Sequence, residues 1–168
     1  NDAVQAEVRL YDRLFTEAFI RPGLAADRWG NRSNYAALNV TPTSPEEMSI
    51  YHKDGRRYTL RTDGFRPVRA GANPGALLTN PVTFTGSRLE INFSASAAGS
   101  MRVELQDMSR KALPGFALAD CKTLVGDKIQ QVVVWKGNPD LAKVANKPTR
   151  LLFEMIECDL YSFQFQDQ

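Results

Sequence analysis

The chain has few of the side chains that build metal centres and nucleophilic sites. Its 168 residues include one histidine, His52, and two cysteines, Cys121 and Cys158. Zinc is usually held by four Cys or His side chains, so this set is too small for a zinc site. No serine or cysteine stands at a recognised catalytic spacing from His52, and packing is its expected role. The sequence predicts no metal and no cofactor.

The chain also lacks a long apolar run and a strong excess of one charge. No apolar segment approaches the ~20 residues of a membrane-spanning helix. The formal net charge is +2, and the basic residues are scattered among acidic ones, whereas a nucleic-acid-binding protein gathers them on one face. The loop at residues 71–75 contains Pro74 and precedes a strand pattern, so it is not a phosphate-binding loop. We therefore expect no nucleic-acid partner and no membrane partner.

The two cysteines leave two interpretations open. A disulfide between Cys121 and Cys158 would tie the loop after Phe116 to the last strand. The alternative, which we favour, is two buried thiols. The cysteines therefore decide little about the redox compartment of the protein.

What the chain does contain is a series of short runs rich in β-branched and aromatic residues, separated by turn residues, as is typical of strands. The clearest are Ile129–Trp135 and Thr149–Ile156. Leu89–Ser94 and Met101–Gln106 alternate apolar and polar side chains, which predicts half-buried strands, and the small residues Ala95–Gly99 are expected to form the turn between them. The sequence predicts an all-β fold, a jelly-roll-like antiparallel β-sandwich of about eight strands. The aromatics Tyr161, Phe163 and Phe165 alternate and are expected on its core face.

A smaller unit precedes this sandwich. Met48–His52 and Tyr58–Arg61 flank a glycine-containing turn and predict a hairpin, and Tyr35–Val40 predicts a further strand. Asp63-Gly64 marks the expected boundary, which places the smaller unit at 1–63 and the sandwich at 64–168. One helical turn is expected at residues 140–145.

Several motifs occur together in the last third of the chain. Trp135-Lys136-Gly137 is followed closely by Asp140-Leu141. A strand with the pattern Lys-Pro-x-Arg-Leu-x-Phe follows at residues 147–153, and a last strand with the pattern Asp-Leu-Tyr-Ser-Phe-x-Phe lies at residues 159–165. These motifs resemble the C-terminal β-sandwich of secreted bacterial proteins related to the five-bladed β-propeller glycoside hydrolases, the clan that acts on fructans, arabinans and similar glycans. Residues 17–23, 29–51 and 56–65 are similar to the last propeller blade of the same proteins.

The resemblance implies that this chain is the C-terminal part of a larger protein, with room for about one blade of ~40–45 residues. No leader pattern opens the chain, so we expect a mature, trimmed or excised form. A repeat unit needs neighbours to complete its core, which predicts a second chain from the same protein with the earlier blades, or a homo-oligomer. The resemblance also implies a carbohydrate ligand and a secreted or periplasmic location.

Glycoside hydrolysis uses two carboxylates across a sugar ring, and the resemblance places both on earlier blades. We therefore expect no catalytic residue in this chain. Glu46 and Glu47 are adjacent on a strand and point to opposite faces, so they cannot form one dyad. One of them, for which we take Glu47, is a candidate for contact with the central cavity of the propeller. The alternative is that Glu47 makes a structural hydrogen bond or lies on the solvated surface.

A second candidate set lies at the entrance of the strand expected at Tyr35–Val40. Trp stacks on a sugar face, and Arg and Asn hydrogen-bond to sugar hydroxyls. The alternative is that the tryptophan caps the blade edge and the arginine makes a local ion pair. The substrate-binding candidates of this set are Trp29, Arg32, Asn34 and Tyr35.

Calcium is a further alternative, suggested by Asp120, Asp127 and Asp159, because calcium prefers oxygen ligands. Their spacing matches no EF-hand loop, and aspartates commonly stabilise turns. We prefer the turn interpretation.

The expected function is an accessory one. The chain would brace the propeller of a glycoside-hydrolase-like protein and would be inactive alone. Two alternatives stay open: a stand-alone, non-catalytic carbohydrate-binding module, and a structural or interaction β-sandwich without sugar affinity.

Overall fold

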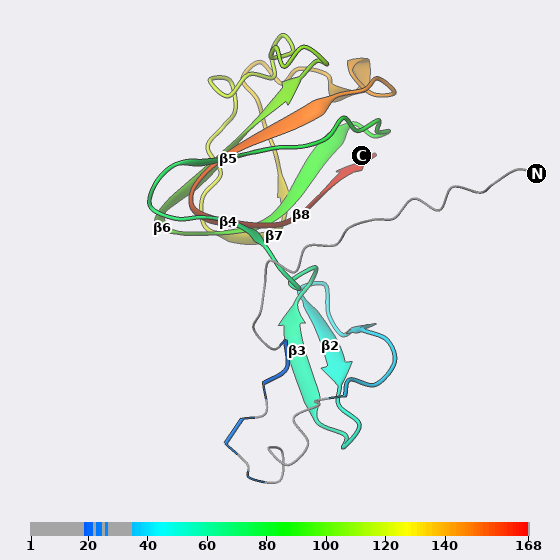
Figure 1. The fold of residues 1–168 in the computed structure, drawn as a ribbon. Coiled ribbons are helices and arrows are strands. Elements are labelled where there is room, and N and C mark those ends of the chain that lie inside the picture. The colour runs from blue at the N-terminus through cyan, green and yellow to red at the C-terminus, as the bar shows by residue number, and fades with distance from the viewer. Residues whose placement is uncertain (1–18, 22, 25, 27–34, 168) are drawn as a thin grey trace, which may run out of the picture.

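The computed structural model of the chain describes residues 19–21, 23–24, 26 and 35–167. Within this part of the chain the strands form two antiparallel sheets, and no α-helix occurs (Figure 1). The all-β fold is therefore confirmed. The small sheet has the order β1-β2-β3 and consists of β1 (Thr41–Pro42), β2 (Glu47–Tyr51) and β3 (Arg57–Arg61).

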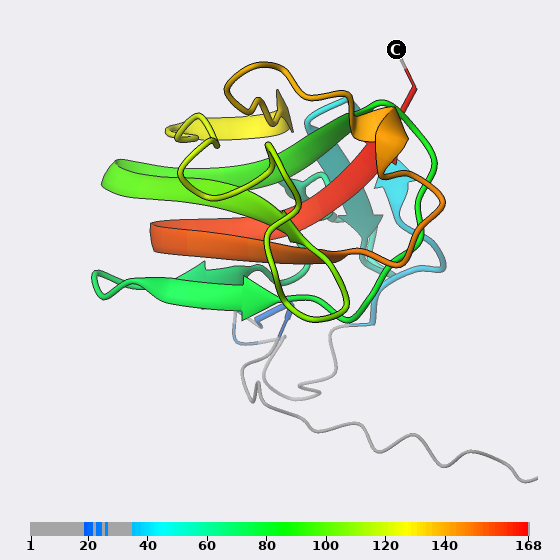
Figure 2. The ribbon, with the colours of Figure 1, turned by 90° about the horizontal axis from the view of Figure 1, so that it is seen from above.

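The larger sheet is built around two long strands, β6 (Arg88–Gln106) and β8 (Arg150–Gln166), which pair with each other along most of their length. β7 (Asp127–Val132) pairs with β6. β4 (Val68–Ala70) and β5 (Gly75–Leu78) both pair with β8. Seen from above, the sheet curls so that its two ends face each other across the core (Figure 2).

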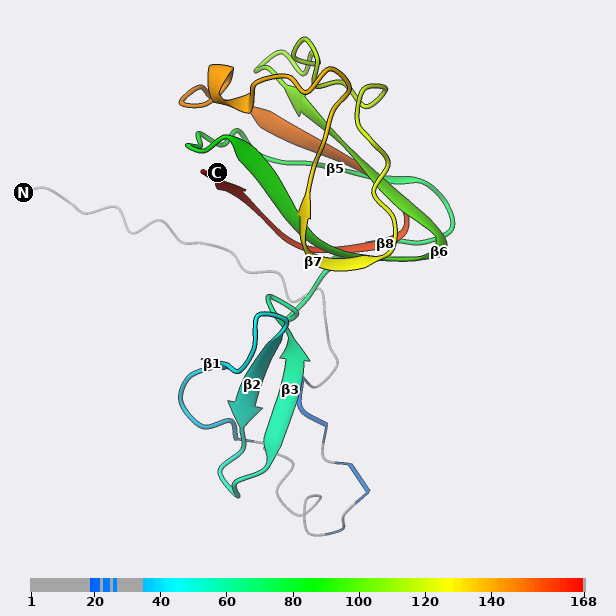
Figure 3. The same cartoon turned by 180° about the vertical axis from the view of Figure 1, so that it is seen from behind.

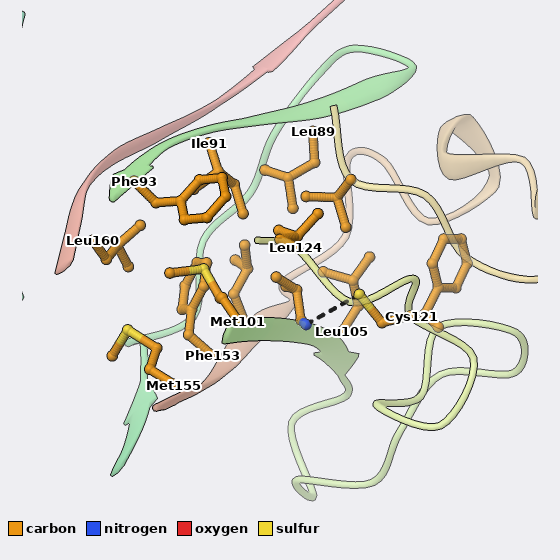
Figure 4. Close-up of a cluster of buried hydrophobic side chains, with 14 of the residues drawn as sticks. Leu89, Ile91, Phe93, Met101, Leu105, Cys121, Leu124, Phe153, Met155 and Leu160 are labelled. Atoms are coloured by element: carbon orange, nitrogen blue, oxygen red, sulfur yellow. Dashed lines mark hydrogen bonds between the residues drawn. The ribbon is translucent and has the colours of Figure 1, made fainter. Parts of the chain in front are cut away.

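The core lies inside this curl. Alternate residues of β6 and β8 point inward, and they are fully or almost fully buried (Figure 4). The inward alternation expected at Leu89–Ser94 and Met101–Gln106 is therefore confirmed. The first segment is not half-buried as expected, because Glu90 and Asn92 on its other face are buried as well. The indole Nε1 of Trp135 donates to the carbonyl of Val103 at 2.9 Å, so this polar group is satisfied inside the core. The central members are Leu89, Ile91, Phe93, Met101, Val103, Leu105, Leu151, Phe153 and Met155.

The turn expected at Ala95–Gly99 does not end the strand. The ladder runs from Ala95↔Cys158 to Ser100↔Ile156, so residues 96–99 bulge out opposite Glu157 alone. β6 and β8 bend sharply here while they stay paired, so the two halves of each strand lie on opposite sides of the core (Figures 1 and 2). A Cβ on Gly99 would collide with the carbonyl oxygen of Glu157, so glycine is required for this close approach. The sequence predicted a turn between two separate strands, whereas the structure has a bend within one strand, because β8 bends alongside and keeps the ladder continuous. Since the long strands replace pairs of short ones, the larger sheet has five strands rather than about eight.

A second bulge moves Tyr161 off the core face. The register passes from Phe93↔Leu160 to Asn92↔Ser162, which leaves one extra residue on β8. Phe163 and Phe165 pack against the core as expected, and Phe165 stacks on Phe84 with ring centroids 3.6 Å apart. The core position expected for Tyr161 is wrong, because the bulge turns its side chain toward the small sheet.

Three smaller predictions have clear outcomes. The hairpin between Met48–His52 and Tyr58–Arg61 is confirmed by β2 and β3. The helical turn at residues 140–145 is confirmed as a 3₁₀ turn, Leu141–Lys143, whose first turn is capped by the Asp140 carboxylate. Tyr35–Val40 does not form a strand; Ala36 alone bridges to His52.

Both cysteines are free and buried, as the favoured interpretation expected. Cys121 Sγ accepts a hydrogen bond from the amide of Val103 at 3.3 Å. Burial raises the pKa of Cys121, and burial together with the nearby Asp159 charge raises the pKa of Cys158 to about 11.

Removal of a core ring tests the packing. Phe153 is fully buried, and Phe153→Ala should lower the free energy of unfolding by about 3–5 kcal/mol, because transfer and cavity costs add. Phe65 is 52% exposed, so Phe65→Ala is the matched control and should cost less than about 1 kcal/mol. Urea unfolding of both variants measures the difference, and equal losses would contradict the assigned core.

The raised pKa of Cys158 predicts a loss of stability in alkali. Above the ordinary thiol pKa of 9.0 the unfolded chain loses this proton, whereas the folded chain keeps it until about pH 11. The free energy of unfolding should therefore fall between pH 9 and pH 11, by up to about 3 kcal/mol from this group. Cys158→Ala should show a shallower fall across the same window in urea titrations, even if its stability at pH 7 is lower. An unchanged slope would argue against this assignment.

Candidate functional site at the junction of the two sheets

The small sheet has one polar face and one apolar face, as alternation along β2 and β3 requires. On the polar face Arg57 forms an ion pair with Glu47 and donates to Ser49 Oγ at 2.8 Å. The hydroxyl of Thr43 donates to Glu47 Oε1 at 3.1 Å. The side chains that alternate to the other face are Met48, Ile50, Tyr58 and Leu60.

Two of the predicted site residues can be placed, and they are not brought together. Tyr35 is 55% exposed, with Lys53 Nζ 5.1 Å from its ring centroid, and Lys53 lies just beyond the far end of β2 from Glu47. The six residues from Glu47 to Lys53 separate them by roughly 20 Å at about 3.4 Å per residue. Trp29, Arg32 and Asn34 lie outside the described residues.

Glu46 and Glu47 lie in different surroundings. β2 begins at Glu47, so Glu46 precedes the strand and the two are not adjacent strand residues as expected. Glu47 is held in the polar network with Arg57. Glu46 lines a cleft between the small sheet and the larger sheet. Contact of Glu47 with the central cavity of a propeller stays a prediction.

The junction itself is organised by Arg61, at the end of β3. Its Nε donates to Asn92 Oδ1 at 2.6 Å, and one terminal nitrogen pairs with Asp127. The other terminal nitrogen donates to the carbonyls of Phe93 and Lys128 at 3.0 and 2.7 Å. The guanidinium lies 4.8 Å from the ring centroid of Tyr161. One side chain of the small sheet therefore contacts three strands of the larger sheet, β6, β7 and β8.

Further contacts around Arg61 join the two sheets. Asn92, which is 3% exposed, donates through Nδ2 to the carbonyl of Thr62 at 2.7 Å. Ser162 Oγ donates to Asp63 Oδ2 at 2.6 Å. Figure 3 shows where the segment after β3 passes into the larger sheet at this point. Burial and then the charge of Asp159 raise the pKa of Tyr161, so its phenol stays neutral beside the guanidinium at physiological pH.

Two hollows that share the lining residue Ile129 flank this contact. An open cleft of ≈ 380 Å³ is lined by Glu46, Arg61, Asp127, Lys128 and Ile129. Ile129 also lines a narrower pocket of ≈ 60 Å³. Side-chain amides, hydroxyls and carboxylates surround this pocket, among them Gln130, Gln164, Ser162, Asp63 and the buried Glu90.

Sequence reasoning gave no signal for Arg61 or Asn92, because an arginine and an asparagine in strand patterns are ordinary surface residues until a second sheet covers them. Asp127 was noticed only as a calcium candidate. Asp127 pairs with Arg61, and Asp159 forms a bidentate pair with Arg69 at 2.6 and 2.7 Å. Among the described residues no group of three or more His, Cys, Asp or Glu side chains is placed to hold a metal ion.

A search of family models, of curated proteins and of solved structures finds no match to this chain. In the described part of the chain, no helix has the length and hydropathy needed to cross a membrane.

Replacement of Arg61 tests the junction. Arg61→Lys keeps the charge but loses the fork that reaches Asn92, Asp127 and two carbonyls. We expect a loss of about 2–3 kcal/mol in the free energy of unfolding, the scale of hydrogen bonds to a charged group, and faster amide exchange in β2 and β3 than in β6 and β8.

Arg69→Lys is the matched control, because Arg69 also pairs with an aspartate but its side chain is 72% exposed. Surface pairs contribute about 0–1 kcal/mol, so this variant should leave amide exchange in the small sheet unchanged. Equal effects of the two substitutions would show that Arg61 does not couple the sheets.

Proposed function

We propose that this chain is the C-terminal accessory portion of a secreted or periplasmic glycoside-hydrolase-like protein, in which residues 1–63 complete a β-propeller and residues 64–168 brace it. The catalytic carboxylates would lie on the missing blades. The observation that carries this proposal is the Arg61 junction, which fixes a small amphipathic sheet to a well-packed sandwich.

The small sheet is the part that would meet the propeller. Its polar face is satisfied by the Glu47–Arg57 network, whereas on its apolar face Met48, Tyr58 and Leu60 are only half-buried. A two- or three-stranded sheet needs a covered hydrophobic face to be stable. A neighbouring blade supplies such a cover, and the sandwich core provides the rigid support behind it.

A stand-alone carbohydrate-binding module is the second candidate, and the cleft beside Arg61 favours it. Ligand pockets are concave and often lie between structural units, and this cleft lies between the two sheets. In that case the chain would be a monomer that binds a glycan without a partner.

The subunit composition of the purified protein separates these functions. Native and denaturing mass spectrometry should find the 18.7 kDa chain bound to an equal amount of a second, larger polypeptide that carries the earlier blades, or to further copies of itself. A single 18.7 kDa monomer would overturn the accessory function and leave the stand-alone module.

Two neighbouring substitutions test which face docks. Leu60→Lys puts a charge on the apolar face, and Thr59→Lys puts the same charge on the polar face, because adjacent strand residues point to opposite sides. We expect Leu60→Lys to weaken the association at least tenfold and Thr59→Lys to leave it within about twofold, as measured by native mass spectrometry. The reverse order would place the interface on the polar face.

A further inference from the structure

We propose that the cleft beside Arg61 binds a neutral, polyhydroxylated ligand of one or a few sugar units. The cleft is lined by Glu46, Arg61, Asp127, Lys128 and Ile129, and its volume of ≈ 380 Å³ falls within the range of small-ligand sites. We identify the polyol as a carbohydrate because of the proposed function. We infer that it is neutral and rich in hydroxyl groups from the side chains that line the cleft.

The two carboxylates and two cations of the lining balance, so the cleft offers no net charge to an ion of either sign. An anion in the cleft would meet the carboxylates of Glu46 and Asp127, and a cation would meet the guanidinium of Arg61 and the ammonium of Lys128. A neutral polyol suffers neither repulsion, because each hydroxyl both donates and accepts. Carboxylates accept from hydroxyl groups, and the lysine ammonium donates to them.

Two of the five lining side chains, Arg61 and Asp127, are held in place before any ligand arrives. Arg61 is fixed by Asn92, Asp127 and two carbonyls, which also positions the Asp127 carboxylate at the mouth of the cleft. Asp127 remains 62% exposed at its side chain, so it is accessible from the cleft. Preorganised groups lose little entropy on binding, which is what a weak ligand such as a sugar requires.

A second pocket, which shares Ile129 with the cleft, adds polar groups beside it. Its ≈ 60 Å³ is room for about two waters at ~30 Å³ each, or for hydroxyl groups in their place. Its lining includes Glu90, which is 6% exposed and is held by Arg88 Nε at 2.9 Å and Gln164 Nε2 at 3.3 Å. Gln130 and Ser162 add further donors and acceptors to the wall. The half-buried Ile129, shared by both hollows, offers an apolar surface to the C–H groups of a sugar ring.

Calorimetric titration of the full chain tests the site with defined probes: fructo-, arabino- and cello-oligosaccharides as neutral polyols, and inorganic phosphate and calcium as the charged ones. We expect at least one neutral oligosaccharide to bind and both ions to fail. Glu46→Gln and Lys128→Ala should each raise its Kd about tenfold, because each removes one charged hydrogen-bonding group.

The matched controls are Asp167→Asn and Lys122→Ala, which remove a carboxylate and an ammonium at exposed positions outside the cleft. They should leave Kd within about twofold, and thermal unfolding should show all four variants folded. Binding of phosphate or calcium alone, no binding of any oligosaccharide, or binding indifferent to Glu46→Gln and Lys128→Ala would overturn the proposal.

This outcome is independent of the accessory function. A chain that joins a larger subunit but binds no sugar would retain the proposed function and lose the cleft site. A lone monomer that binds sugar through Glu46 and Lys128 would retain the cleft site and lose the accessory function.

Discussion

The junction of the two sheets, and with it the cleft between them, depends on how Arg61 is held. This guanidinium uses all of its nitrogens at once, on a side-chain amide, a carboxylate and two backbone carbonyls, and it also lies over an aromatic ring. A lysine would offer a point charge and could not satisfy this fork of acceptors. Because the side chain is only 19% exposed, its bonds are shielded from water and salt. The small sheet, which has little core of its own, is therefore fixed to a unit that has a large one.

The irregularities of the long strands make this contact available. The extra residue on β8 near Tyr161 turns the tyrosine out of the core and under the guanidinium. The larger bulge at residues 96–99 bends β6 so that one strand serves both ends of the curled sheet. Bulges commonly re-aim a side chain in this way. The same features that interrupt the ladder therefore connect the core to the junction.

Side-chain donors also bond to backbone carbonyls of β7, at the edge of the larger sheet. β7 is an edge strand, and unpaired carbonyls on such a strand invite pairing with other chains. The carbonyl of Lys128 accepts from Arg61, and that of Val132 accepts from the side-chain amide of Gln131. Arg61 thus joins the two sheets, caps an edge and forms one wall of the cleft. Its replacement would disturb all three, which is why the cleft is better probed at Glu46 and Lys128.

The sequence by itself determined the all-β class, the hairpin at β2 and β3, and the alternation of the inner face. These follow from local rules: side chains alternate along a strand, and turn residues end it. Only the tertiary structure decided that Ala95–Gly99 is a bend within one strand, that Tyr161 leaves the core, and that Glu46 lines a cleft between the sheets. Each of these depends on which strand lies opposite, and Arg61 and Asp127 are 66 residues apart in the chain. A pattern read along one strand carries no information about a partner that distant, so the junction and its cleft arise only when the sheets meet.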